Sequence, residues 1–308
     1  MNQTDKMQTL LDALDFFKKK MIEANQLRNA ISQRFDSELR AHREEKERGD
    51  RPGLEGIPRS AQNMFYRDLI SGEAKIYGAK QLFLDDQIAA AYMHKNRHFQ
   101  WVLAEAYENF EGFLTRLYAA TGYVDQNFWP ISDFGNVRIS DIGSKDFEWF
   151  LKQAKTKKNK PDSILTAFRS SFQNLKKIEL KNKLDLHVVF ELVMISKLRH
   201  LIVHNAGRAE NKEEVVRRML SEAAINTKDK EVLTARADKF FKTVNGTQDV
   251  HVFLLGHQIP NTPFITVYNL TDLTEFLVSY AQLLTEETLR HLYANGHVAG
   301  TAEMSTPS

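Results

Sequence analysis

The first 48 residues carry apolar side chains at every third or fourth position, and no Gly or Pro interrupts them. This spacing predicts one long helix with an apolar stripe along one face. A helix of roughly 45 residues would be about 65 Å long at 1.5 Å per residue. We expect either a coiled-coil or dimerisation arm, or an ordinary packed helix with a solvated end. The stripe consists of Leu10, Leu14, Phe17, Met21, Ala24, Leu27, Ile31, Phe35 and Leu39.

Residues 49–60 contain three Gly and two Pro, which predicts an exposed linker. Helical spacing then returns and predicts a second helical block over residues 60–122, which Gly122 is expected to end. Residues 122–145 mix Gly, Pro, Asn and Asp with short apolar steps. We therefore predict a loop there, with one short strand at residues 137–142.

Further helices are predicted from their start and stop signals. Ser144 or Asp146 is a candidate N-cap, and another helix is expected from Asp162. The most apolar stretch of the chain, residues 184–206, predicts a buried helix that ends at a glycine. Asn211, followed three residues later by a glutamate, resembles a capping box that opens the next helix.

The C-terminal part changes character. Runs of β-branched and aromatic residues at 250–255 and 264–268 flank a turn rich in Gly, Pro and Asn, which predicts a hairpin. An amphipathic helix is expected from Asp272. The chain is thus predicted to consist of a helical arm at 1–48, a linker at 49–60, a helical domain at 61–225, a hairpin and helix at 226–296 and a disordered tail at 297–308.

The charges of the chain are nearly balanced, with 42 Lys and Arg against 40 Asp and Glu and a formal net charge of +2. Contact with nucleic acid would therefore have to come from local basic patches. The chain has no cysteine, which excludes disulfides, iron–sulfur clusters, cysteine nucleophiles and thiolate zinc sites. It has neither a long apolar run nor a signal-peptide pattern, so we expect a cytoplasmic protein that has no membrane partner.

Histidines offer the remaining candidates for chemistry. Two pairs have a spacing of four residues, His94 with His98 and His200 with His204. Neither pair encloses the glutamate of a zinc protease, and no carboxylate follows at metal-ligand spacing. No phosphate-binding glycine loop, nucleophile elbow or kinase signature is present. We therefore predict no metal site and no cofactor.

One polar cluster interrupts the most apolar helix close to its end, in the segment SKLRHLIVHN at residues 196–205. On an ideal helix Ser196, His200 and His204 form one polar stripe. Charged groups among Leu, Ile and Val cost free energy unless something compensates them. A salt bridge at the helix end, compensation of the helix dipole or a polar seam against another helix would do so. The grouping of one Arg, two His and one Asn favours a function.

The order Arg199, a polar residue, three apolar residues and His204 resembles the R-(polar)-x3-H signature of the HEPN superfamily (higher eukaryotes and prokaryotes nucleotide-binding). The segment AYENFEGFLTRLY at residues 106–118 is similar to the leading HEPN helix, with Glu111 in an apolar stripe. The resemblance covers residues 95–225, with 122–160 as an insertion. It implies a mainly α fold, a HEPN-like helical bundle, to which this chain adds a long N-terminal helix and a small C-terminal hairpin plus helix.

The resemblance also implies an activity, which is metal-independent RNA cleavage by an R-x4-6-H ribonuclease that needs no cofactor. His204 suits this chemistry because imidazole titrates near neutral pH and can exchange a proton with a ribose 2′-hydroxyl or a leaving 5′-oxygen. Arg199 would stabilise charge on the phosphate. His200 or Asn205 would carry the second proton or orient the phosphate, with Glu111 in support. The products would be a 2′,3′-cyclic phosphate and a 5′-hydroxyl.

The geometry of one helix constrains this site, since five residues separate Arg199 and His204 by about 140° around the axis. Two copies of the helix related by a two-fold axis would bring both residue types into one cleft, so we predict a homodimer. Two lysine clusters would follow the RNA phosphates, or would simply be solvated surface. They consist of Lys152, Lys155, Lys157, Lys158, Lys160, Lys176 and Lys177.

The biological role implied by the resemblance is that of a toxin or an antiviral defence effector, with an antitoxin or sensor protein as a further partner. Two alternatives stay open. The first is a non-catalytic HEPN-like module that binds RNA, a nucleotide or a protein. The second is a structural helical dimer in which the polar cluster at residues 196–205 is the seam.

Overall fold

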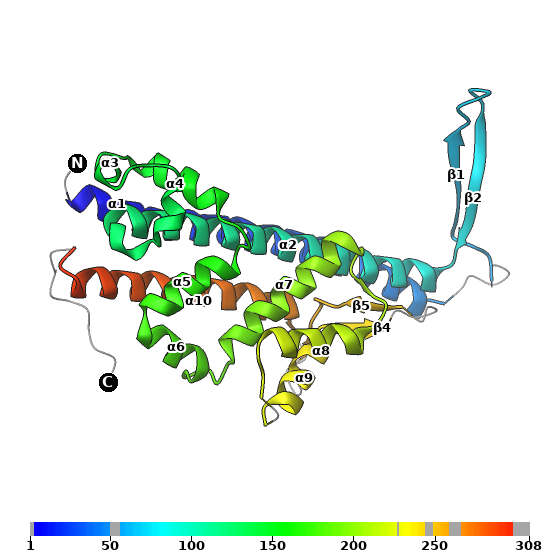
Figure 1. Ribbon diagram of the computed structural model, residues 1–308. Coiled ribbons are helices and arrows are strands. Elements are labelled where there is room, and N and C mark those ends of the chain that lie inside the picture. The colour runs from blue at the N-terminus through cyan, green and yellow to red at the C-terminus, as the bar shows by residue number, and fades with distance from the viewer. Residues whose placement is uncertain (1–2, 50–55, 227, 244–248, 259–265, 298–308) are drawn as a thin grey trace. The chain divides into compact units, whose positions relative to one another are not determined.

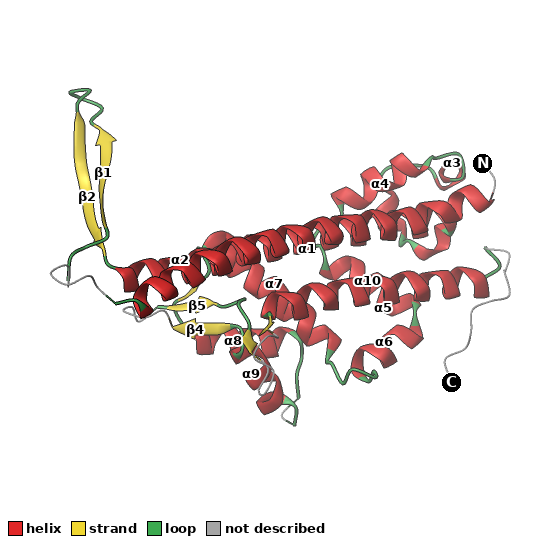
Figure 2. Cartoon of the chain, turned by 180° about the vertical axis from the view of Figure 1, so that it is seen from behind, coloured by secondary structure: helices red, strands yellow, loops and turns green. Residues whose placement is uncertain are grey.

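The computed structural model describes residues 3–49, 56–226, 228–243, 249–258 and 266–297 (Figure 1). It is mainly helical, as predicted, with a few short strands (Figure 2). The chain divides into a larger unit, residues 1–25 with 100–308, and a smaller unit, residues 26–99. The elements are α1 Gln3–Glu47, β1 Ser60–Arg67, β2 Ala74–Leu82, α2 Leu84–Val124, η1 Gln126–Phe128, η2 Ile131–Phe134, α3 Ile139–Ile142, α4 Phe147–Thr156, α5 Asp162–Ser171, α6 Gln173–Leu180, α7 Val188–His204, β3 Arg208–Ala209, α8 Lys212–Glu222, α9 Lys230–Asp238, β4 Phe241–Thr243, β5 Val250–Val252, β6 His257–Gln258, β7 Thr266–Val267 and α10 Asn269–Ala294.

The long N-terminal helix α1 forms as its apolar spacing predicts, and all but one of the predicted stripe residues are buried. In the larger unit, Phe17 packs against Phe110 of α2 with ring centroids 6.0 Å apart. In the smaller unit, Phe35 contacts the ring of His98, also on α2, at 5.3 Å. Each half of α1 therefore packs against α2 of the same chain, in agreement with the packed-helix interpretation.

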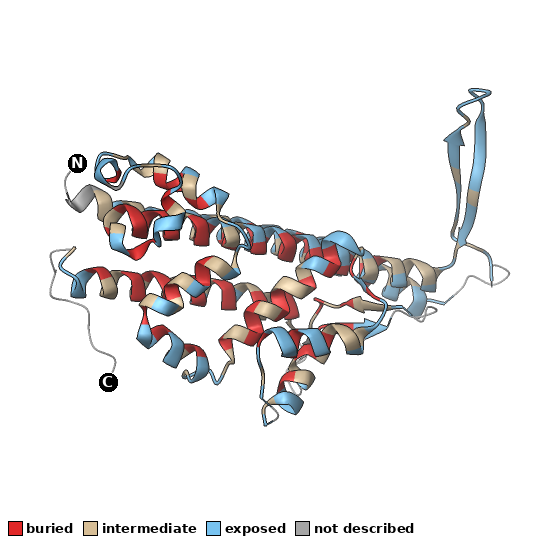
Figure 3. Ribbon diagram, viewed as in Figure 1, coloured by how far each residue is buried: buried red, intermediate tan, exposed pale blue. Residues whose placement is uncertain are grey.

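Residues 60–82 form an antiparallel hairpin of β1 and β2, so the helix predicted there is wrong. The turn explains the difference. The Asp68 carboxylate accepts hydrogen bonds from the backbone N–H groups of Ile70 at 2.9 Å and Ser71 at 2.8 Å, and Gly72 has a φ of +73°. This local turn chemistry reverses the chain, and the flanking aromatic and β-branched residues favour strands. Both faces of the hairpin are largely exposed (Figure 3).

The helix α2 continues to Val124, so Gly122 does not end it. Instead, Gly122 makes room for Trp129, because a Cβ at this glycine would lie 2.4 Å from the indole Nε1. The indole donates a hydrogen bond to the Tyr118 carbonyl at 3.0 Å and stacks on the Tyr118 ring. The strand predicted at residues 137–142 is also wrong, because the last four of these residues form the short helix α3.

Two of the predicted helix caps are confirmed, at α4 and α8. The start expected at Asp272 is wrong, because α10 begins at Asn269 and its N-cap is Tyr268. The Asp146 side chain accepts a hydrogen bond from the Trp149 N–H at 2.9 Å and begins α4. The Asn211 side chain accepts one from the Glu214 N–H at 2.9 Å and begins α8. Each carboxylate or amide oxygen satisfies a backbone donor that has no partner within the first turn of its helix. These ends are therefore set by local sequence.

The predicted C-terminal hairpin is wrong in its pairing. β5 does not pair with β7 but lies between β3 and β4 in an antiparallel sheet of order β3-β5-β4. β7 pairs instead with β6. β5 and β7 each lie within one of the two predicted stretches, but their partner strands come from other parts of the chain. The predicted disordered tail lies outside the described residues, apart from His297.

The helix α7 lies at the centre of the larger unit and is buried on most of its faces (Figure 3). Its apolar composition explains this, because each large apolar side chain removed from water contributes about 1.5–3 kcal/mol. No described helix, α7 included, is long and apolar enough to cross a membrane. Its buried residues are Val188, Phe190, Glu191, Leu192, Met194, Ile195, Leu198, Leu201 and Ile202.

The one carboxylate among these buried residues, Glu191, is paired. Arg236 of α9 donates to it through Nε at 2.9 Å and through Nη2 at 3.0 Å, and a third contact joins Arg236 to Asp272 of α10 at 3.4 Å. A buried carboxylate without such a partner would be strongly destabilising. This bidentate pair therefore connects α7, α9 and α10.

Two glycines of α2 provide a test of this packing. Gly122→Ala should destabilise the protein by about 1–3 kcal/mol, because the new methyl group overlaps the Trp129 ring. The matched control is Gly112→Ala in the same helix, where no atom lies within 4 Å of the new methyl. It should stabilise by about 0.5–1 kcal/mol, because Gly is a poorer helix former than Ala. Urea unfolding measures both, and equal effects would contradict the packing.

Candidate functional site

The polar cluster of residues 196–205 lies where α7 ends. The helix is regular to His204, Asn205 is its C-cap, and the next two residues have left-handed φ values, +53° at Ala206 and +75° at Gly207. The Gly207 N–H donates to the Leu201 carbonyl at 2.9 Å, which closes the last turn. The helix stop predicted from this glycine is confirmed, and it explains why α7 changes from buried to exposed within one turn.

The end of α7 is held by two neighbouring elements. A Cβ at Gly207 would lie 2.6 Å from the Gln100 side-chain amide on α2, so a larger residue here would displace the Gln100 side chain. Gln100 donates to the Val252 carbonyl of β5 at 2.7 Å, and the Val252 N–H donates to the Gly207 carbonyl at 2.8 Å. The last turn of α7 therefore has a fixed position between α2 and β5.

His200 and His204 lie side by side on the exposed end of α7, with ring centroids 4.6 Å apart. Partial burial lowers the pKa of His200, and the positive charges of His204, Lys197 and Arg199 lower it further. Lys197 is itself paired with Glu222 of α8 at 2.7 Å. At neutral pH the lowered pKa favours a neutral His200, which is the state that can accept a proton.

Arg199 lies on a different face of α7, towards α2. Its charge acts on Glu111 and Tyr107, and its Nε is buried without a hydrogen-bond partner in the described part of the chain. Burial raises the pKa of Glu111, while Arg199 opposes this rise. The structure therefore places Arg199 close enough to Glu111 for their charges to interact, and both residues are predicted from the sequence. It places the two histidines together in a second group.

The predicted lysines differ in their surroundings. Lys157 is largely buried, forms an ion pair with Asp133 and lies 5.1 Å from the centroid of the Tyr118 ring, so it is engaged inside the chain. Lys160 donates to the Lys155 carbonyl at 2.9 Å. The side chains of the remaining predicted lysines are exposed. These are Lys152, Lys155, Lys158, Lys176 and Lys177.

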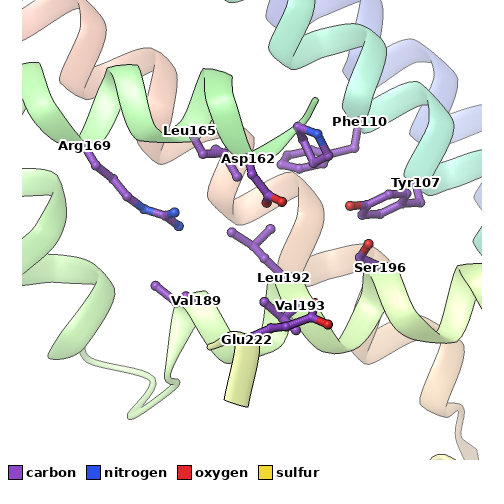
Figure 4. Close-up of a pocket in the computed structure, with 11 residues that line it drawn as sticks. Tyr107, Phe110, Asp162, Leu165, Arg169, Val189, Leu192, Val193, Ser196 and Glu222 are labelled. Carbon is purple, nitrogen blue, oxygen red and sulfur yellow. The ribbon is translucent and has the colours of Figure 1, made fainter. Parts of the chain in front are cut away.

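A cavity of about 500 Å³ lies between α2, α5 and α7, and sequence reasoning missed it (Figure 4). Its apolar wall includes Phe110, Leu165, Val189, Leu192 and Val193. These side chains come from three segments that are far apart in the sequence, which is why no local pattern indicated a cavity. The local sequence gave one indication of a site, which is that polar residues such as Tyr107, Arg169 and Ser196 interrupt otherwise apolar helices.

The polar groups of the cavity are Tyr107, Asp162, Arg169, Ser196 and Glu222. Figure 4 shows the Tyr107 hydroxyl directed towards the Ser196 hydroxyl, with Asp162 and Arg169 further along α5. Burial raises the pKa of Tyr107 to about 12, so this phenol stays protonated and can donate a hydrogen bond. The cavity thus offers donors and acceptors on an apolar background, the usual composition of a small-molecule site.

Within the described ranges, no three His, Asp or Glu side chains are placed to hold a metal ion together. The histidines of this site are able to transfer protons, and its arginines are able to stabilise negative charge.

The lowered pKa of His200 can be tested directly. Lys197→Met removes a positive charge beside the imidazole and frees the carboxylate of Glu222, and both changes favour the protonated ring. The pKa of His200 should therefore rise, as measured by NMR titration of the imidazole nitrogens. Lys176→Met on α6 is the matched control and should leave the titration unchanged. A fall in the pKa with Lys197→Met would contradict the assigned electrostatics.

No family model, curated protein or solved structure matches this chain. The assignment of a function therefore rests on the residues at the end of α7 and on the geometry around them.

Proposed function

We propose that the protein is a metal-independent endoribonuclease of HEPN type whose active site is the exposed end of α7. The proposal combines the likeness of Arg199–His204 to the HEPN signature with one structural observation. This observation is the pair of adjacent imidazole rings, His200 and His204, on an exposed surface and 4.6 Å apart. Two adjacent titratable rings that solvent can reach suit the transfer of protons to and from a substrate.

The reaction assigns a role to each histidine. His200, kept neutral by its lowered pKa, accepts the proton of a ribose 2′-hydroxyl. The 2′-oxygen forms a bond to phosphorus as the bond to the 5′-oxygen breaks, and His204 donates a proton to this leaving oxygen. The products are a 2′,3′-cyclic phosphate and a 5′-hydroxyl. The balance of atoms requires neither a metal nor another reactant.

Arg199 would stabilise the negative charge that develops on the phosphate. Within one chain it lies on the α2 side of α7, away from the exposed histidine pair, as the 140° separation on an ideal helix requires. A second copy of α7, related by a two-fold axis, would place the arginine of one chain near the histidines of the other. We therefore propose a homodimer with a composite site. Asn205, exposed at the C-cap, would help to orient the phosphate.

The exposed lysines on α4 and α6, and in the loop after α4, would contact RNA phosphates, whereas Lys157 is excluded by its ion pair. A role as a toxin or antiviral effector with an antitoxin or sensor partner stays a prediction from the resemblance.

RNA cleavage in EDTA tests the chemistry. His204→Ala should slow cleavage by about 10²- to 10⁴-fold through loss of a proton carrier, and Arg199→Ala by about 10²- to 10³-fold. His94→Ala is a matched control, because His94 is an exposed histidine with a partner four residues away, His98, and lies in the other unit. It should leave the rate unchanged. On the acid side of its pH profile, the wild-type rate should fall as the pH drops through the lowered pKa of His200.

The other outcomes separate the alternatives. RNA binding without cleavage by the wild type would favour a non-catalytic binding module. Loss of dimerisation or folding in both variants, with no RNA binding, would favour the structural dimer.

Mixed dimers test the composite site. When chains carrying Arg199→Ala are combined with chains carrying His204→Ala, one site of each mixed dimer regains an intact arginine and an intact histidine. Random pairing should therefore restore about a quarter of the wild-type rate per chain, because half of the dimers are mixed and one of two sites is intact. The single variants measured separately are the controls. An inactive mixture, or full activity in a monomer, would overturn the composite site.

A further inference from the structure

We propose that the cavity between α2, α5 and α7 is a nucleobase subsite that selects guanine. This inference deepens the proposed function, because it names the base that would be held next to the cleaved bond. The cavity holds a carboxylate, Asp162, and a guanidinium, Arg169, on one helix, with apolar walls on either side (Figure 4).

Arg169 is fixed in position before any ligand binds. Its Nε donates to both oxygens of the buried Glu179, at 3.0 and 2.8 Å, and the Tyr280 hydroxyl of α10 donates to the same carboxylate. Glu179 is 2% exposed, so the network is almost dry. Figure 4 shows the guanidinium at the edge of the cavity. A guanidinium held this way presents its outer N–H groups as a planar fork without losing further side-chain freedom.

Asp162 provides the opposite chemistry. Its side chain lines the cavity, is exposed and forms no salt bridge in the part of the chain that the structure describes. It lies seven residues before Arg169 on α5, which puts both on the same face about 10.5 Å apart along the axis. Two side chains that reach inwards over this distance can hydrogen-bond two different edges of a single planar ring system.

Guanine is the base that matches this pair. Its N7 and O6 accept a bidentate pair of hydrogen bonds from an arginine, and its Watson–Crick edge offers N1–H and an amino group to a carboxylate. Adenine would present its amino group towards the arginine and an unprotonated ring nitrogen towards the carboxylate, and both contacts are repulsive. Uracil and cytosine carry their polar groups along one edge and cannot span the two side chains. The apolar walls would cover the faces of the ring.

The cavity adjoins the proposed catalytic end of α7. Ser196, which lines it, precedes His200 by four residues, one helical turn. Tyr107 also lines the cavity, and the positive charge of Arg199 acts to lower the pKa of its hydroxyl. A base held here would therefore lie about one helical turn from the proposed catalytic histidines.

Direct binding tests the subsite without any need for cleavage. Guanosine 5′-monophosphate should bind the full-length protein in a calorimetric titration, and the adenosine, cytidine and uridine monophosphates should bind at least tenfold more weakly. Asp162→Asn should weaken binding of the guanosine nucleotide by roughly tenfold to a hundredfold and leave the other three unchanged. Glu148→Gln, another exposed acid in the first turn of a helix, is the matched control and should have no effect.

A second variant locates the site, and cleavage mapping links it to RNA. Val193→Phe fills the cavity from α7 and should abolish nucleotide binding while its unfolding midpoint stays at the wild-type value. In a mixed-sequence RNA, cuts should lie beside guanines, and Asp162→Asn should lose this preference but still cleave. Equal binding of all four nucleotides, or cleavage without base preference, would overturn the guanine subsite and leave the ribonuclease proposal intact. Selective guanosine nucleotide binding without any RNA cleavage would refute the ribonuclease and keep the guanine site.

Discussion

The structure of the larger unit depends on the burial of α7. This helix is apolar on most of its surface, so it has to be surrounded by other elements, and burying each of its large side chains contributes about 1.5–3 kcal/mol. The same burial would be unfavourable for Glu191, and Arg236 offsets it with two hydrogen bonds. The position of α9 therefore follows from a charge on α7, in addition to its apolar contacts.

The burial of α7 also determines which of its polar side chains solvent can reach at the exposed end of the helix. Gly207, at a φ that favours glycine and in close approach to Gln100, ends the helix. One turn earlier the side chains separate into two groups. Arg199 stays between helices beside Glu111, whereas His200 and His204 face solvent. The different surroundings of residues adjacent in sequence follow from the 100° step of the helix.

A second buried charge network orients the Arg169 guanidinium at the edge of the cavity. Glu179 on α6 joins Arg169 of α5 to Tyr280 of α10, and it is almost completely removed from water. In this environment the ion pair is hardly screened, so the guanidinium has one strongly preferred orientation. The cavity that results combines a fixed donor with apolar walls, and it lies one helical turn from the histidine pair.

Local sequence was enough to predict the long helices, the caps at Asp146 and Asn211, the stop at Gly207 and the polar cluster on α7, because each depends on residues within one or two turns. It was misleading at residues 60–82, where an Asp68 turn outweighed the helical spacing, and at β5 and β7, whose partner strands lie elsewhere in the chain. Tertiary packing determines which of Arg199, Glu111 and the histidines lie close together, and it also creates the cavity of Asp162 and Arg169. Hydrogen-bonded turns and caps are local, whereas a cavity and a buried ion pair form only when side chains from distant segments pack together.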